Sequence, residues 1–409
     1  MVNLESTSAA ASPPASVSGR PGTLPGLLVS LTTLTHDALA TMLANLALAF
    51  PGQTTLVASP DAALGEGIGP LQKTSSSIQL IPYMPAAPSG SAWVLTAADY
   101  LNTFRLAKEH HATSCLMLGV NAQSLRPDAI RELAEAANRV DLALACYEIG
   151  PREGLVNSAM LYPVTRALYG TRPRYPLAID LGLSLRMAER LAIAAQKFTA
   201  ANQNDALIWP IAEAAAANYT LTEVAVGQRT LPQPNSPDLN SLLAQIAGSL
   251  FTDIELKASY WQRARGNQSP RHLAPHPLQE AMPDVQPMLD SFRLAYTNLH
   301  EIWSLVLPPN SLLGLKKLSL LAATEFRMPD ALWTRIVYDF ILAYRLRTIN
   351  RGHLLGALTP LYLAWVASHI VLANNGTSPE AHVEQQAVAF EADKPYLVSR
   401  WRWPDRFNP

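Results

Sequence analysis

Cysteine is scarce in this chain. Only 2 of its 409 residues are cysteines, which excludes a disulfide scaffold and a four-cysteine zinc site. Neither charge dominates, since 31 Lys and Arg face 32 Asp and Glu and leave a formal net charge of -1. A nucleic-acid binder needs a clustered basic surface, so we expect no nucleic-acid partner. The low cysteine content favours a reducing, cytoplasmic location.

Several short catalytic motifs are also missing. The sequence contains no Walker loop, GxSxG, HExxH or GxGxxG, and the glycine cluster Gly65–Gly69 lacks the strand and helix that would make it a phosphate loop. Residues 1–25 are rich in Ser, Ala, Pro and Gly without the basic head and apolar run of a signal peptide. We interpret them as a disordered tail.

One apolar run is long enough to cross a membrane. Residues 354–373 include Thr359, Pro360, Ser368 and His369, which a spanning helix would have to satisfy or hide. We therefore predict a buried helix of the protein core and no membrane span. With 49% hydrophobic residues, the chain has enough apolar side chain for a large core.

The first half alternates strand-like and helical patterns, which predicts an α/β layered sheet. The predicted strands cover 26–34, 53–59, 77–82, 114–118 and 141–148, and the predicted helices 37–50, 97–111 and 126–137. Ligands of such sheets bind outside the carboxyl ends of the strands. The informative segments should therefore be 32–35, 59–61, 119–124 and 147–154.

The second half is predicted to be all-helical. Long helical periods cover 239–261, 288–307, 331–346, 351–373 and 381–391. The proline-rich residues 269–287 read as a linker or a long loop between helices. Long apolar helices of this kind would also support a homodimer.

Three stretches carry a family resemblance by their shared order. They are YPVTRALYG at 162–170, PLAIDLGLS at 176–184 and FEADKPYLVSRW at 390–401. Together they resemble bacterial GT-A glycosyltransferases near the mannosylglycerate and glucosyl-3-phosphoglycerate synthases, over residues 26–401. The resemblance implies an α/β, Rossmann-like GT-A domain over 26–252 that binds a nucleotide sugar, followed by an all-helical domain over 253–409. It also implies hexosyl transfer from a nucleoside diphosphate sugar to a small acceptor, with an acidic acceptor as one option.

The metal motifs of that family are degenerate here. Its aspartate-x-aspartate becomes Gly119-Val120-Asn121, and the histidine of its LGxKxH turn becomes Leu231. Hard cations such as Mg²⁺ or Mn²⁺, usual in the family, prefer anionic oxygen ligands. We therefore predict no metal ligands and an altered or absent metal dependence. The alternatives are a catalytically inactive, glycosyltransferase-like binding or assembly protein and, less favoured, a helical interaction protein scaffolded by its α/β half.

The resemblance also places residues on the donor side of the site. Those predicted to bind the nucleotide sugar are Thr32, Thr33, Asp61, Asn121 and Arg229. Asp61 would accept hydrogen bonds from the base or ribose, unless it is only a Pro-Asp turn residue. Arg229 would hold phosphate, unless it is a solvated surface arginine.

The acceptor side is predicted from the segment YEIGPREG at 147–154 and from the 176–184 stretch. Asp180 and Glu153 are the predicted catalytic residues, although Asp180 could instead cap a helix over 183–195. The predicted acceptor-binding residues are Tyr147, Arg152, Gly154 and Ser184.

Overall fold

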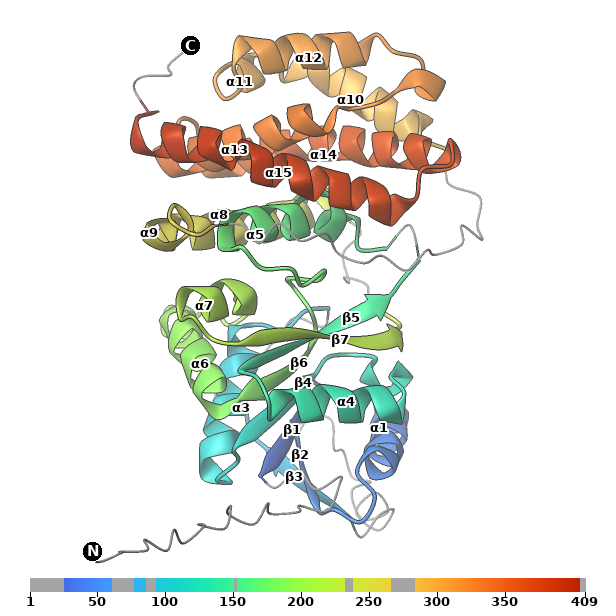
Figure 1. Cartoon of the computed structure of the whole chain (residues 1–409), viewed down its shortest axis with the longest axis vertical. Helices are drawn as coiled ribbons and strands as arrows, with labels where there is room; N and C mark the ends of the chain where they lie inside the picture. Colours follow the sequence, from blue (N-terminus) through green and yellow to red (C-terminus); the bar gives the residue numbers. More distant parts are fainter. Residues whose placement is uncertain are drawn as a thin grey trace, which may run out of the picture.

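Seven strands form one mixed sheet in the first half of the chain, in the order β3-β2-β1-β4-β6-β5-β7 (Figure 1). The computed structural model describes residues 26–60, 77–85, 93–150, 153–231, 238–265 and 284–404. The strands are β1 (Leu27–Leu31), β2 (Thr55–Pro60), β3 (Ile78–Tyr83), β4 (Ser114–Leu118), β5 (Leu142–Glu148), β6 (Asp180–Ser184) and β7 (Leu221–Gln228).

The direction of β6 sets it apart from the other strands. β6 pairs antiparallel with both β4 and β5, whereas the other neighbouring strands are parallel. From β1 the chain adds β2 and β3 on one side and then returns to place β4 on the other. Strand order therefore reverses between β1 and β4, and such a switch point leaves a crevice at the carboxyl ends of the two strands.

Helices cover both faces of the sheet. In Figure 1, α1 (His36–Ala49) and α4 (Pro127–Ala137) lie on one face, and α3 (Ala97–Glu109) and α6 (Leu185–Thr199) on the other. Helix α4 shows why these segments dock, because its buried Ile130, Leu133, Ala134 and Ala137 recur at helical spacing. α7 (Pro210–Ala216) follows α6, and the short helix η3 (Ala122–Ser124) follows β4.

The remaining helices stack beyond the β7 edge of the sheet (Figure 1). They are η4 (Asn157–Leu161), α5 (Tyr162–Tyr169), α8 (Leu239–Leu256), α9 (Ala258–Trp261), α10 (Gln286–Asn298), α11 (His300–Ser304), α12 (Pro309–Ser319), η5 (Ala323–Glu325), α13 (Asp330–Leu346), α14 (Arg351–Asn374) and α15 (Pro379–Arg402). A mixed α/β sheet followed by a helical region confirms the predicted fold class.

Helix α14 is the long apolar run of the sequence. By length and composition it could cross a membrane, but 78% of its most apolar window is buried inside the protein. Its polar groups find partners there: the Ser368 hydroxyl accepts a hydrogen bond from the Met328 N–H at 2.8 Å, and the Nδ1 atoms of His369 and His382 lie 2.7 Å apart. This placement agrees with the predicted core helix.

Helix α5 belongs to the helical layer although it lies between β5 and β6 in the chain. It packs against α15, where the buried Arg166 pairs with Glu384 and, at 3.0 Å, with Glu391. Nearby, Arg174 pairs with Glu380 of α15 at 2.9 Å. The predicted domain boundary after residue 252 falls inside α8, which packs on α13 and α14.

Candidate functional site

The predicted site residues meet at one edge of the sheet because of the strand pairing. Leu31 at the end of β1 pairs with Leu118 at the end of β4, and Leu118 pairs with Asp180 at the start of the antiparallel β6. On the other side of β6, Tyr147 of β5 pairs with Gly227 near the end of β7. The segments after β1, β4 and β7 therefore share this edge with the first residue of β6.

An ion pair between Asp180 and Arg229 lies at the centre of this edge. The Arg229 Nε lies 2.9 Å from Oδ2 of Asp180, and Nη2 lies 3.3 Å from Oδ1. Both side chains are 0% exposed. Arg229 follows β7 directly, so the pair joins the end of one strand to the start of another.

The other donors of the Arg229 guanidinium are also used. They bond the carbonyl oxygens of Val120 and Thr230, each at 2.8 Å, and the Ser124 hydroxyl at 3.4 Å. A guanidinium has five N–H groups in a fixed fork, and these contacts occupy all of them. Arg229 is thus neither a solvated surface residue nor, in this arrangement, a direct ligand for phosphate.

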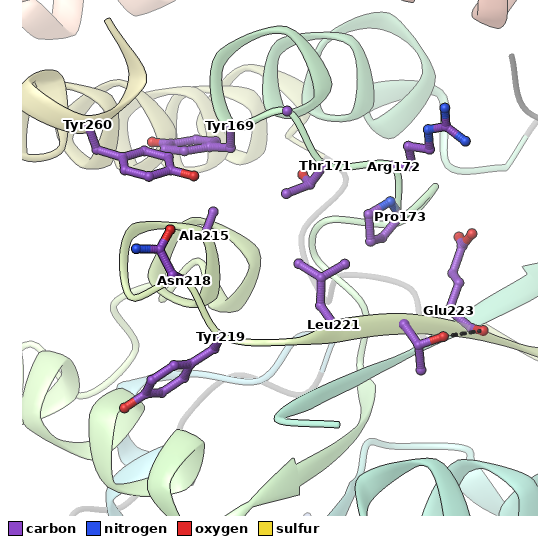
Figure 2. Close-up of a pocket in the computed structure, with 12 residues that line it drawn as sticks. Tyr169, Thr171, Arg172, Pro173, Ala215, Asn218, Tyr219, Leu221, Glu223 and Tyr260 are labelled. Atoms are coloured by element: carbon purple, nitrogen blue, oxygen red, sulfur yellow. Dashed lines mark hydrogen bonds between the residues drawn. The ribbon is translucent and has the colours of Figure 1, made fainter. Parts of the chain in front are cut away.

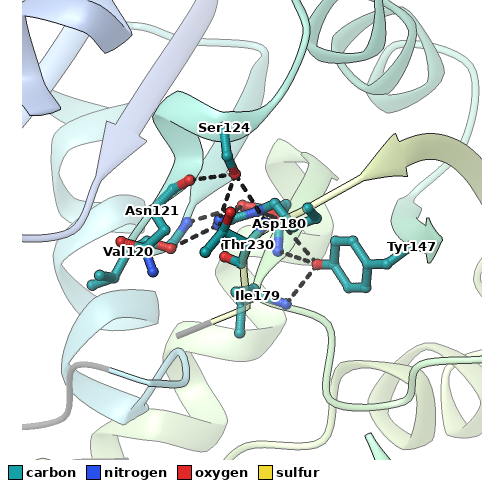
Figure 3. A network of polar contacts seen from close by, with 9 residues as sticks. Val120, Asn121, Ser124, Tyr147, Ile179, Asp180 and Thr230 are labelled. Carbon is teal, nitrogen blue, oxygen red and sulfur yellow. Dashed lines mark hydrogen bonds and ion pairs between the residues drawn. The ribbon is translucent and has the colours of Figure 1, made fainter. Parts of the chain in front are cut away.

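The carboxylate of Asp180 is equally saturated. Besides Arg229 it accepts hydrogen bonds from the Gly119 N–H at 3.1 Å and the Tyr147 hydroxyl at 3.1 Å (Figure 3). A general base needs a free oxygen within reach of the substrate proton, and this buried carboxylate offers none here. The alternative that Asp180 caps a helix is wrong, because Asp180 begins β6.

Tyr147 stabilises the Asp180–Arg229 ion pair through hydrogen bonds. Its hydroxyl accepts hydrogen bonds from the Ile179 and Asp180 N–H groups, both at 3.1 Å, while it donates to the Asp180 carboxylate (Figure 3). Burial, with the neighbouring Asp180 charge, raises the pKa of Tyr147 well above its ordinary value. The side chain therefore positions the carboxylate and does not face an acceptor.

The residues at this edge do not fit a divalent cation. Gly119 has no side chain, and a Cβ there would lie 3.0 Å from the Ile179 carbonyl oxygen, so the space that a carboxylate needs is filled. Leu231 has no ligand atom in its side chain, and the buried guanidinium of Arg229 already neutralises the Asp180 carboxylate at this edge. Within the described ranges, the structure has no group of three or more His, Cys, Asp or Glu side chains that could hold a metal.

Some of the residues nearest the β1–β4 switch point are accessible to solvent. Thr33 is exposed and Asn121, which has a φ of 65°, is half-buried. The hydroxyls of Thr32, after β1, and Ser59, near the end of β2, are buried without a hydrogen-bond partner among the residues that the structure describes. Asp61, the predicted base or ribose contact, lies outside the described residues.

Two of the predicted acceptor-side residues, Glu153 and Gly154, follow β5 in the chain. Glu153 is exposed and accepts a hydrogen bond from the Gly150 N–H at 2.9 Å, and Gly154 has a φ of 62° that suits glycine. Arg152 lies outside the described residues.

Ser184 does not join the site, which corrects its prediction as an acceptor ligand. Because β6 runs antiparallel to β4, Ser184 pairs with Ser114 at the opposite edge of the sheet. There it caps α6 by accepting a hydrogen bond from the Met187 N–H at 3.3 Å. Residues that the sequence reasoning missed are Ser124 and Ser59, although both fall in segments predicted to be informative.

Comparison with solved structures yields a weak likeness. No protein-family model and no curated protein matches the sequence. Among solved structures, the chain is similar to glucosyl-3-phosphoglycerate synthase from Mycobacterium tuberculosis, crystallised with Mn²⁺, UDP and glucosyl-3-phosphoglycerate. The two are 13% identical with a TM-score of 0.33, and the match covers 56% of this chain and 78% of that one. A likeness at this level carries no functional argument, so the proposal below rests on the geometry.

Proposed function

We propose that this chain is a GT-A-type glycosyltransferase that binds a nucleoside diphosphate sugar without a divalent cation. The sugar would pass to a small acceptor, and the enzyme would act in the cytoplasm as a homodimer. The observation that supports this best is the topological switch point between β1 and β4, where ligands of α/β sheets bind. The family resemblance also implies that the donor binds at this place.

Unsatisfied polar groups mark the proposed donor pocket. A buried hydroxyl without a partner costs roughly 1–3 kcal/mol, and the hydroxyls of Thr32 and Ser59 are both in this state beside the switch point. The imide N–H of a base or the hydroxyls of a ribose would satisfy them. Thr33 and Asn121 would contact the same ligand, and Asp61 is retained as the proposed contact to base or ribose.

Catalysis at such a site would rest on positioning. Arg229 orders the loop 119–124 through its hydrogen bonds to Val120 and Ser124. Its effect on the donor would therefore be indirect, through the position of this loop. Glu153 is an exposed carboxylate on the acceptor side. We propose that it contacts the acceptor hydroxyl, and that rate enhancement comes from orientation of donor and acceptor.

A second candidate function follows from the saturation of the ion pair. Since Asp180 and Arg229 bond each other and the backbone, neither of these two side chains is free to stabilise charge in a transition state. This favours a non-catalytic protein that binds a nucleotide sugar in the same cleft.

Calorimetry with UDP-glucose and GDP-mannose, each in excess Mn²⁺ or EDTA, tests both candidates. We expect one donor to bind equally well with and without the metal, and Thr33→Tyr to abolish binding by filling the cleft. Thr41→Tyr is the matched control, because Thr41 is also an exposed threonine and is not among the predicted site residues. Release of nucleoside diphosphate on addition of acceptor supports the transferase, and binding without release supports the second candidate. Absence of heat with every donor overturns both.

A further inference from the structure

A crevice unrelated to the proposed donor cleft lies between the sheet and the helical layer. It has a volume of about 540 Å³, within the roughly 300–1,000 Å³ range of small-molecule sites. Its walls come from the end of α5 and the segment after it, from α9, and from the end of α7 with the start of β7 (Figure 2).

One wall is a rigid aromatic surface. Tyr169 and Tyr260 stack with their ring centroids 6.2 Å apart and their planes at 19°. The Tyr169 hydroxyl donates to the buried Asp253 at 3.0 Å, which fixes its ring. A flat apolar ring face suits the C–H face of a sugar or another planar apolar group.

Polar groups surround the same opening. The Thr171 hydroxyl is buried and has no hydrogen-bond partner in the described part of the chain, and Asn218 is exposed. Figure 2 shows Thr171, Asn218 and Tyr260 around one space above Leu221. An amide and a hydroxyl beside a ring face provide donors and acceptors for a ligand with many hydroxyls.

The electrostatics of the crevice disfavour a phosphate. Arg172 and Glu223 contribute one charge of each sign to the lining. Helix α5 ends here at Tyr169 with Gly170 as its cap, and a helix C-terminus carries partial negative charge. A neutral ligand fits this lining better than a nucleotide.

The crevice is separate from the donor cleft. Leu221 pairs with Leu142 at the start of β5, whereas Gln228 pairs with Glu148 at its end. At about 3.3 Å per residue, the two edges are roughly 20 Å apart along these strands. We propose that this crevice is a second ligand site that binds the face of a neutral saccharide. The proposal does not depend on whether the chain transfers a sugar.

The test is titration of the full chain with a panel of glucose, mannose and galactose oligosaccharides, followed by calorimetry and saturation-transfer NMR. We expect at least one oligosaccharide to bind. Tyr260→Ala should weaken that binding about tenfold, which corresponds to about 1.4 kcal/mol. Tyr296→Ala is the matched control, because Tyr296 is a similarly half-buried tyrosine on α10.

Thr171→Val separates binding from folding. The variant keeps the side-chain shape and removes a hydroxyl that makes no hydrogen bond in the protein, so the melting temperature should not fall. Saccharide binding should weaken about threefold by the loss of one hydrogen bond. UDP should not displace the saccharide, and UDP-glucose binding should be unchanged in both variants. The proposal is overturned if no oligosaccharide binds, if both variants bind like the parent chain, or if UDP competes.

Discussion

Replacing Arg229 by methionine isolates the contribution of the buried ion pair. The change keeps an apolar stem of similar length but leaves the fully buried Asp180 carboxylate with only the Gly119 N–H and the Tyr147 hydroxyl as partners. The carbonyl oxygens of Val120 and Thr230 also lose their donor. Breaking a buried pair by removing one member costs about 3–5 kcal/mol, and we expect Arg229→Met to lower the free energy of unfolding by that amount.

Urea unfolding followed by tryptophan fluorescence measures this loss. Adding Asp180→Asn to Arg229→Met removes the stranded charge, so the double variant should be more stable than the sum of the single changes predicts, with a coupling of about 2 kcal/mol. Arg126→Met is the control, since Arg126 pairs with Asp128 at the surface, where both side chains are more than half exposed, and should change stability by less than about 1 kcal/mol. A loss below about 1 kcal/mol for Arg229→Met, or strict additivity, would refute the reasoning.

Two further predictions concern the metal position and the helical layer. Gly119→Asp restores a carboxylate of the family motif but places its Cβ 3.0 Å from the Ile179 carbonyl oxygen. The variant should lose about 1–3 kcal/mol of folding stability and should bind no Mn²⁺ in calorimetry. Tight Mn²⁺ binding would contradict the conclusion that this edge does not fit a divalent cation. Burial lowers the pKa of His369 from its ordinary value to about 3, so the unfolded chain takes up a proton first and stability is lost as pH falls from about 6.5 towards 3. His369→Phe should flatten that loss in melting temperatures measured between pH 7 and pH 4, and parallel curves for both proteins would argue against it.

Much of the α/β fold is predictable from the sequence, because its strands are continuous apolar runs between helical patterns. The predicted strand at 114–118 coincides with β4, and the predicted helix at 126–137 differs from α4 by one residue. Strands β6 and β7 were missed. In β6, Gly182 suggests a loop by composition, but a Cβ at this position would come within 2.8 Å of Ala137 on α4. That close packing is a tertiary property which no local pattern reports.

The chemical roles assigned to the candidate site residues remain predictions. The sequence analysis assigned Gly119 to the degenerate metal motif, Tyr147 to the acceptor side, Asp180 to catalysis and Arg229 to the donor side, and the strand pairing brings their segments to one edge. The sequence did not indicate that Asp180 and Arg229 form a buried ion pair. Their burial depends on the packing of segments 49 residues apart in the chain. The error for Ser184 has a simpler origin, since an antiparallel strand delivers its last residue to the far edge.

The position of α5 bears on how this protein is made. Helix α5 is covered by α15, the last helix that the structure describes. The buried guanidinium of Arg166 on α5 has its carboxylate partners at residues 384 and 391. During synthesis those carboxylates emerge 218 and 225 residues after Arg166, so the buried ion pairs of Arg166 cannot form until α15 has been made. Expression of residues 26–252 alone would remove α15 and leave Arg166 without both carboxylate partners, so truncations should keep α5 and α15 together.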